Sequence, residues 1–516
     1  MINAAKKWWS QPISTKLFVG LFCPMFIFYI LYLVSCSPMQ IDMYFMVASG
    51  REILTNGIPY HNVWTIDSDS SIVLQQWSYD VILALLDKVG YLGFLSFVIV
   101  ELAAFMILSF YFFRQGKNKR LFCTIGIGIA LFITQAYTFS IRPELITLLL
   151  ILIQCIVLDR YRDTGSRKWL AVLPVVMLVE INVHASMWPI HYAVILAYMV
   201  PAFYTQSIKS NDVHSMWKGI IAASVCMFGI MFINPYGIDG ILYVIRSYIA
   251  DTFKYVDIQE IMNTEIVSCW GAAIIVVCVL LFLCIKFRVL KSVTINIMLG
   301  FLTMAAMSPR NNMFLLIAVL FLWRDLCDAD FEVKLDWRKD LKRSIIPVLL
   351  AADMFFAGLF GMRCPLFHID YDRMLTTGVI FDIADYIEQS DVEDPRVFTD
   401  MDAGSHLEYK GFKNVYIDSR PEIYTADFTG DNNILADFSR YAVWGFTVPS
   451  IRNEKSGITV TDDEMQMWLD SYDFDYLVIC SETEPYLAGY MSRNSDYRRV
   501  DQFSGRWLLY ERVDVL

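Results

Sequence analysis

Residues 91–113 read YLGFLSFVIVELAAFMILSFYFF, an apolar run whose one charged residue is Glu101. A spanning α-helix needs roughly 17 to 25 mostly apolar residues, because each residue advances the helix by about 1.5 Å across a hydrocarbon layer about 30 Å thick. This run therefore predicts a membrane-spanning helix. Comparable runs lie at residues 13–35, 120–139, 143–160, 186–205, 216–233, 267–286, 290–307 and 344–361. Two shorter runs, 169–179 and 313–323, bring the predicted total to about eleven spanning helices.

The composition also favours a membrane protein over a soluble one. The 516 residues are 56% hydrophobic and 18% charged, against about 45–50% and about 25% in ordinary soluble domains. Residues 362–516 hold 14 Lys/Arg and 29 Asp/Glu, a formal charge of −15, whereas residues 1–361 carry +4. The sequence therefore predicts an α-helical polytopic membrane domain over residues 1–361 and an acidic, water-exposed domain over residues 362–516. No basic surface for nucleic acid is expected.

The basic residues predict how the chain lies in the membrane, because Lys and Arg are retained on the cytoplasmic side. With the N-terminus inside, the predicted inner segments collect 22 Lys/Arg and the outer segments collect 6. An odd number of spans then places the acidic domain on the extracytoplasmic side. We expect a multi-pass protein of the plasma membrane with a cytoplasmic N-terminus.

Two outer loops, residues 37–90 and 234–266, are long enough to hold structure of their own. In the first, apolar residues at helical spacing predict two short helices, separated by the turn Asn56-Gly57-Ile58-Pro59. The acidic domain alternates β-rich and helical patterns, which is typical of a small α/β domain. Its predicted strands lie at 396–399, 414–418, 475–480 and 507–511, and its predicted helices include 403–410 and 463–471.

Polar residues at the ends of spanning helices are candidates for function, because each is costly in lipid unless it faces a cavity or a partner. In the predicted topology the notable ones fall on the outer side. They are Asp42, Arg142, Asn182, His184, Asn234, Glu260, Arg310, Asn311 and Asn312. Their clustering predicts one outward-facing polar cavity.

Several short motifs follow one another along nearly the whole chain. They are residues 42–53 (DMYFMVASGREI), Asn56-Gly-Ile-Pro59, Gln76-Trp77-Ser-Tyr-Asp80, Arg142-Pro143-Glu144, Asn182-Val-His184-Ala-Ser186, Asn234-Pro-Tyr-Gly237, Gln259-Glu260, Pro309-Arg310-Asn311, Asp402-Ala-Gly404-Ser-His-Leu407 and Tyr416-Ile-Asp418-Ser-Arg420. In this order they resemble bacterial GT-C glycosyltransferase-like membrane proteins. The last two motifs are similar to that family's extracytoplasmic domain.

The resemblance implies transfer of a sugar from a polyprenyl-phosphate carrier to a glycan, lipid or protein acceptor on the outer face, with inversion at the anomeric carbon. The family's base is a carboxylate in the first outer loop, and Asp42 is the residue that matches. An acceptor hydroxyl must lose its proton as it attacks, and an ionised carboxylate within hydrogen-bond reach can take it. Arginines suit the leaving lipid phosphate through their fork of donors. The expected substrate-binding residues are Arg142, Asn182, His184, Glu260 and Arg310.

The motifs depart from the family at two points. His61-Asn62 and Gln76 stand where relatives frequently carry acidic residues. A carboxylate-bound divalent cation is therefore left open, and no other cofactor is implied, because the lipid-linked sugar is itself the activated donor.

Structural roles compete with these functional ones. Asp is a favoured helix N-cap, so Asp42 could simply begin the helix that follows it. Arg142 could anchor a helix at the head groups, and His184 could satisfy a buried hydrogen-bond network. Asp418 and Arg420 are interpreted as a structural pair within the acidic domain.

Two other classes of function stay open. A bundle with an outward polar cavity also suits a transporter or flippase for a lipid-linked glycan, although no internal repeat is found. A non-catalytic member of the fold could instead bind a glycan through the acidic domain. The transferase hypothesis makes a geometric prediction: Asp42 and at least two of Arg142, His184, Glu260 and Arg310 should border one pocket beneath the acidic domain.

Overall fold

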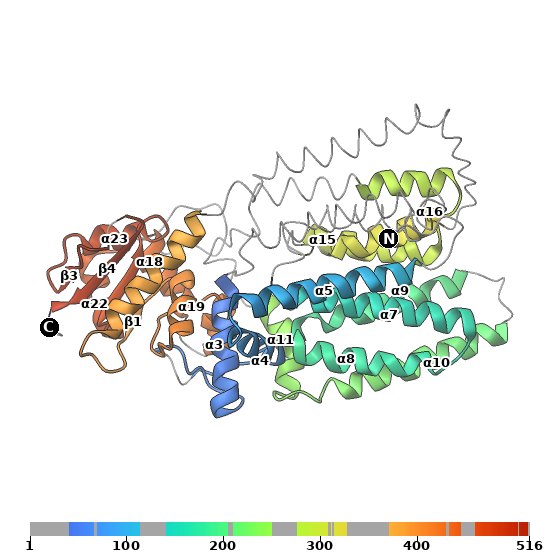
Figure 1. Ribbon diagram of the computed structural model, residues 1–516, viewed down its shortest axis with the longest axis horizontal. Coiled ribbons are helices and arrows are strands. Elements are labelled where there is room, and N and C mark those ends of the chain that lie inside the picture. Colours follow the sequence, from blue (N-terminus) through green and yellow to red (C-terminus); the bar gives the residue numbers. More distant parts are fainter. Residues whose placement is uncertain are drawn as a thin grey trace, which may run out of the picture.

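The computed structural model describes residues 41–66, 70–113, 141–204, 210–249, 276–307, 311, 314–327, 371–429, 433–444, 460–503 and 505–513. In Figure 1 the described part is elongated, with a helical bundle at one end and the acidic domain at the other. Helix α3 (Ile41–Asn56) stands across the molecule between them.

The bundle is built from helices that run along the long axis of the molecule (Figure 1). They are α5 (Tyr91–Phe112), α7 (Glu144–Thr164), α8 (Val172–Val183), α9 (Trp188–Tyr204), α10 (Ser210–Ile230), a helix over Val276–Lys286, α15 (Ser292–Met307) and α16 (Leu315–Cys327). Short 3-10 turns precede α8 and α9, at Trp169–Ala171 and Ala185–Met187. Each predicted apolar run that falls in the described ranges therefore forms a helix.

Packing within the bundle follows the helical period. On α7 the buried residues Leu145, Leu148, Ile151, Leu152 and Cys155 recur every three or four positions, so they form one apolar stripe. Helix α5 packs on α7, α7 packs on α8, and α8 packs on α10. These helices share one continuous apolar core.

The prediction of about eleven spanning helices is wrong. In the described part of the chain one helix, over Tyr91–Ser109 of α5, is both long and apolar enough to cross a bilayer. Helices α8 and α16 have 12 and 13 residues, and at about 1.5 Å per residue neither reaches across about 30 Å. Helix α7 has 21 residues but ends in the charged stretch DRYRDT. The predicted spans at 13–35, 120–139 and 344–361 lie outside the described residues.

The two helices predicted in the first outer loop are present as α3 and α4 (Trp77–Asp87). Residues 43–50 of α3 are all buried, so protein surrounds this part of the helix on every side. Gly50 permits the close contact with α4, because a Cβ atom there would lie 2.0 Å from the backbone oxygen of Asp80. Gly57, at φ +90°, follows the last helical residue of α3.

The acidic domain is an α/β domain, as predicted. Its sheet has the strand order β1-β2-β4-β3, with β1 parallel to β2 and the other pairs antiparallel. The strands are β1 (Val397–Phe398), β2 (Tyr476–Cys480), β3 (Tyr497–Arg499) and β4 (Trp507–Arg512). The α-helices are α18 (Tyr371–Glu388), α19 (Met401–Lys410), α20 (Ala426–Thr429), α21 (Ile434–Asp437), α22 (Asp462–Tyr472) and α23 (Pro485–Met491). A 3-10 turn (Pro421–Tyr424) and a π-helical segment (Phe438–Trp444) complete it.

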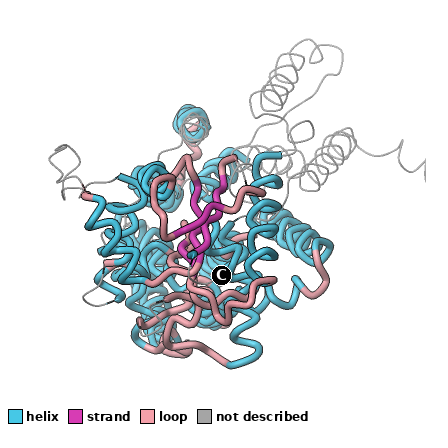
Figure 2. The backbone as a smooth tube through the Cα atoms, turned by 90° about the vertical axis from the view of Figure 1, so that its left-hand side faces the viewer, coloured by secondary structure: helices cyan, strands magenta, loops and turns pink. Residues whose placement is uncertain are grey.

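Side chains cover both faces of this sheet. Every residue of β2 is buried, and alternation along the strand sends Leu477 and Ile479 into one apolar cluster and Val478 and Cys480 into another. Figure 2 looks at this end of the molecule and shows the strands as one small twisted sheet in front of the helices. A strand buried on both faces reads as a continuous apolar run, which is why the sequence identified it.

The strand predicted at 414–418 is wrong as a sheet strand. Val415 instead makes isolated bridges, to Val397 on one side and to Thr65 of the first outer loop on the other. The backbone bonds Val415 N to Trp64 O and Ile66 N to Val415 O, both 3.1 Å, join the loop to the domain. The extended segment is therefore shared between two parts of the chain that are about 350 positions apart.

Candidate functional site

The first contact between predicted site residues joins Asp42 to Arg142. Asp42 lies in the first turn of α3, and Arg142 lies two residues before α7 begins. Arg142 Nη2 is 2.9 Å from Asp42 Oδ2, and the two side chains are 8% and 24% exposed. The carboxylate is thus held by a buried guanidinium while part of it stays accessible to solvent.

Further polar groups lie behind this pair. Tyr79 of α4 is fully buried and its hydroxyl has no hydrogen-bond partner. Burial, and then the charges of Glu101 and Glu144, raise the pKa of Tyr79, while the charge of Arg142 opposes them. Carboxylates from α5 and α7 and the Arg142 guanidinium therefore all lie near one phenol. In the sequence, Glu101 is the one acidic residue within an apolar run, a pattern that indicates a functional or paired group.

Asp80, the next residue of α4, is also fully buried, and neither carboxylate oxygen has a hydrogen-bond partner. Burial raises the pKa of Asp80 well above its usual value, and the positive charge of Arg420 only partly opposes this. Burial of this kind disfavours the charged form of a carboxyl group. Asp42, which is partly exposed and paired with Arg142, is therefore the better candidate for an ionised base.

His184 belongs to a buried network that links α7, α8 and α9. Its Nδ1 lies 3.1 Å from Thr147 Oγ1, which also donates to Glu180 at 2.7 Å. Glu180 in turn lies 3.0 Å from His191 Nε2. Since Thr147 lies five residues after Arg142, His184 sits close to the start of α7. The predicted structural role of His184 is confirmed, and direct contact with substrate stays a prediction.

Asn182 holds three segments together. Its Oδ1 accepts from Trp77 Nε1 at 3.0 Å, and its Nδ2 donates to the carbonyl of Ile233 at 2.9 Å. Ser78 Oγ donates to the Asn182 carbonyl at 2.7 Å. The side chain thus ties α4 to α8 and to the turn that follows α10. Substrate binding by Asn182 stays a prediction.

The other polar residues of the predicted outer side are accounted for as follows. Asn234 caps its own turn, donating to the carbonyls of Met231 and Gly237 at 2.8 and 2.9 Å. Asn311 donates to the carbonyl of Met304 at 3.0 Å. Glu260, Arg310 and Asn312 lie outside the described residues. Of the four expected neighbours of Asp42, Arg142 is in direct contact with it.

The acidic domain meets α3 through a buried charged cluster that local sequence patterns do not indicate. Arg420 Nη2 lies 2.6 Å from Asp418 Oδ2 and 3.0 Å from Glu408 Oε1, so the predicted pair of Asp418 and Arg420 is confirmed. The guanidinium also lies 5.0 Å from the ring centre of Phe45 and 4.9 Å from that of Trp64. Phe45 is one turn from Asp42 on α3. The domain therefore fixes the helix that carries Asp42.

The protonation states of this cluster differ. Burial raises the pKa of Glu408 well above its usual value, against the charge of Arg420. Burial would also raise the pKa of Asp418, but the Arg420 guanidinium and hydrogen bonds, including a 2.5 Å bond from the Tyr424 hydroxyl, hold it below the ordinary value. The surroundings thus favour the ionised form of Asp418, the partner of Arg420, whereas burial disfavours the ionised form of Glu408.

His406 of α19 provides a pH-dependent contact in the same interface. Its ring lies 4.2 Å from the Tyr44 ring, centre to centre, and its Nδ1 lies 2.6 Å from the Asp402 carbonyl oxygen. Burial lowers the pKa of His406 to about 4. The folded protein therefore keeps this imidazole neutral at pH values where an unfolded chain protonates it.

We expect acid to destabilise the protein through His406. The stabilisation is complete above pH ~6.5, where an unfolded histidine is neutral, and about 3 kcal/mol is lost as the pH falls to about 4. The measurement is thermal unfolding of the full chain between pH 7 and pH 4. His406→Gln should flatten this part of the profile, and the same change at the exposed His61 should leave it unaltered. Equal profiles for wild type and His406→Gln would contradict the assignment.

No model of a known protein family matches this sequence, and no curated protein matches it either. The resemblance to GT-C glycosyltransferases therefore rests on the motifs alone. Within the described ranges, no group of three or more His, Cys, Asp or Glu side chains is placed to hold a metal ion.

Proposed function

We propose that this chain is a glycosyltransferase that moves a sugar from a polyprenyl-phosphate donor to an acceptor at the outer face of a plasma membrane. The observation that carries the proposal is the ion pair between Asp42 and Arg142, two residues that the motifs assigned to one site from positions 100 residues apart. It joins a partly exposed carboxylate to a buried guanidinium.

Asp42 suits the attacking acceptor hydroxyl, and Arg142 suits the leaving phosphate. Asp42 accepts the proton of the acceptor hydroxyl as that oxygen bonds to the anomeric carbon. The bond from that carbon to the phosphate oxygen breaks, and its electron pair leaves with the lipid phosphate. Arg142, which contacts Asp42 through Nη2, is the guanidinium that we propose binds the departing phosphate. Attack opposite the leaving group inverts the anomeric carbon.

The acidic domain supports this role by covering α3. Helix α19 packs on α3, and Arg51 of α3 donates to the Tyr409 carbonyl at 2.7 Å. Lys413 lies 3.5 Å from Glu52. These contacts hold α3 against the acidic domain, and a base that is held in place is oriented for the acceptor hydroxyl.

The surface of the bundle supports a membrane location. Large apolar side chains are exposed along its helices, including Leu92, Val100 and Ile107 of α5, Val225 and Phe228 of α10, and Leu299 of α15. Exposed apolar surface is unfavourable in water by about 25 cal/mol per Å², and lipid removes that cost. We infer that lipid surrounds this part of the chain and that α5 crosses the bilayer. The proposal keeps the N-terminus in the cytoplasm and the acidic domain outside.

The test is turnover by the purified full chain, reconstituted in vesicles with a polyprenyl-phosphate hexose or pentose labelled in the sugar. We expect labelled sugar to leave the carrier and free polyprenyl phosphate to accumulate. Movement of intact donor between leaflets without bond cleavage would favour the flippase alternative instead. Glycan binding without turnover would favour the non-catalytic alternative, and either result would contradict the transferase.

A further inference from the structure

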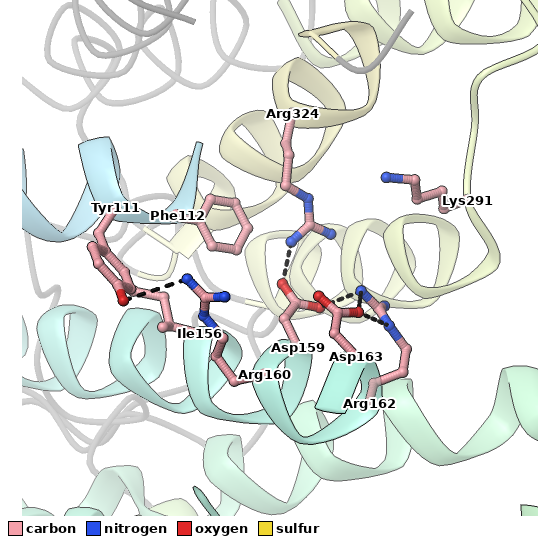
Figure 3. A pocket seen from close by; sticks show the side chains of 9 residues that line it. All are labelled: Tyr111, Phe112, Ile156, Asp159, Arg160, Arg162, Asp163, Lys291 and Arg324. Atoms are coloured by element: carbon pink, nitrogen blue, oxygen red, sulfur yellow. Dashed lines mark hydrogen bonds and ion pairs between the residues drawn. The ribbon is translucent and has the colours of Figure 1, made fainter. Parts of the chain in front are cut away.

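A charged pocket lies where the last turns of α5, α7 and α16 meet (Figure 3). Its volume is about 50 Å³, several times the roughly 10–15 Å³ that one water molecule needs. It is lined by Tyr111, Phe112, Ile156, Asp159, Arg160, Arg162, Asp163, Lys291 and Arg324. Asp159 is 17 residues beyond Arg142, so about 25 Å of helix α7 separates this pocket from the Asp42 site.

Arg324 is the central residue of the pocket. It comes from the last turn of α16 and its side chain is 8% exposed. The guanidinium lies 4.4 Å from the ring centres of both Phe112 and Phe321. Its Nη1 donates to Asp159 Oδ2, and Figure 3 shows it pointing from α16 toward that carboxylate on α7. Two aromatic rings and one acid thus fix the plane of the guanidinium.

The other edge of this guanidinium consists of Nε and Nη2. Arg324 Nε and Nη2 are both buried and have no hydrogen-bond partner. These two nitrogens form the edge of the fork that binds two oxygens of a phosphate or carboxylate side by side. Leaving such donors unbonded in a buried site is costly. The two rings and Asp159 therefore hold two buried donors side by side, in the position that suits an anionic ligand.

The charges around the pocket favour an anion as well. Four basic side chains line it against two acids, and both acids are paired: Asp159 with Arg324 and Arg162, and Asp163 with Arg162. Lys291 is 41% exposed at the rim and lies 3.5 Å from the buried Asp325 carboxylate. Arg160 stacks 5.4 Å from the Tyr111 ring centre. When Asp325 is included, the four basic side chains exceed the acidic ones by one, which favours an anionic ligand.

We propose that this pocket binds a phosphate group, carried either by an anionic phospholipid head group or by inorganic phosphate. The ligand takes the Nε and Nη2 donors of Arg324 and draws Lys291 and Arg160 onto its other oxygens. This site is separate from the proposed transferase site and does not depend on that activity.

The test is calorimetric titration of the full chain in a zwitterionic detergent. One arm uses orthophosphate, one uses a short-chain phosphatidylglycerol, and one uses the matching phosphatidylcholine. We expect saturable binding of orthophosphate or phosphatidylglycerol, and the arm that binds identifies the source of the phosphate. Phosphatidylcholine should bind at least about 10-fold more weakly than the anionic ligand, because its head group carries no net charge.

Two variants test whether the ligand binds in this pocket. Arg324→Gln should abolish it, and Lys291→Gln should weaken it by about 10-fold, because each removes a charge-assisted hydrogen bond. Since Lys291 also pairs with the buried Asp325, thermal unfolding is used to confirm that each variant is folded. Arg167→Gln makes the same charge change at an exposed position just beyond the end of α7 and should bind as wild type does. Absence of binding in all arms, or equal binding by wild type and Lys291→Gln, overturns the proposal.

Discussion

Asp42→Asn should lower kcat for sugar transfer by about 10²- to 10⁴-fold, because an amide cannot accept the proton that the attacking hydroxyl must lose. The substitution keeps the shape of the side chain. Arg142 can still donate to the amide oxygen across the contact that is 2.9 Å in the wild type. We therefore expect the thermal unfolding of the variant to stay near that of the wild type while turnover is lost. The measurement is single-turnover transfer from the labelled polyprenyl-phosphate donor.

Asp239 offers a matched control for this variant. It lies in the first turn of α11 (Ile238–Ile249), as Asp42 does in α3, and it pairs with Arg246 at 3.1 Å. Its side chain is 49% exposed. Asp239→Asn should keep full activity. Equal kcat values for wild type and Asp42→Asn would remove Asp42 from the role of base and leave it as a helix-terminal residue paired with Arg142.

The largest effect on stability is expected from Arg420→Met. Methionine fills much of the same space but leaves the buried, ionised Asp418 without its partner, and breaking a buried ion pair in this way costs about 3–5 kcal/mol. The stacking on Phe45 and Trp64 is lost as well. We expect a lower free energy of unfolding, measured by denaturant titration of the full chain.

A control and a rescue make this prediction specific. Arg440 pairs with Glu464 at 3.2 Å in a partly exposed position, so Arg440→Met should cost at most about 1 kcal/mol. Adding Asp418→Asn to Arg420→Met removes the unpaired charge and should restore part of the stability. If the double variant were less stable than Arg420→Met alone, the ionised state assigned to Asp418 would be wrong.

The sequence predicted local elements well where one pattern dominates. The run at 91–113 became α5, and the apolar run at 475–480 became the central strand β2. The number of spanning helices was overestimated, because a window of apolar residues does not show where a helix begins and ends. The run at 169–179 forms a 3-10 turn and then the 12-residue α8, which a hydropathy pattern alone cannot distinguish from a longer helix.

Contacts between distant segments set the other limit. Motif order placed Asp42 and Arg142 in one site, and the structure brings them together. The order of the motifs does not show that Val415 bonds to the first outer loop, or that Arg420 stacks on Phe45. Those contacts depend on how a finished domain packs on a helix, which leaves no local periodicity to detect. The Arg324 pocket leaves no local pattern either, because in the sequence its basic residues indicate only the orientation of the chain in the membrane.

The most direct test of the proposed site is a double-mutant cycle on Asp42 and Arg142. The values compared are kcat/KM for sugar transfer by wild type, Asp42→Asn, Arg142→Gln and the double variant, each confirmed as folded by thermal unfolding. Groups that act on one reaction as a unit give strongly non-additive losses. We predict that the double variant loses about as much activity as the worse single variant. Losses that multiply in the double variant would show that the two residues act independently and would contradict the shared site.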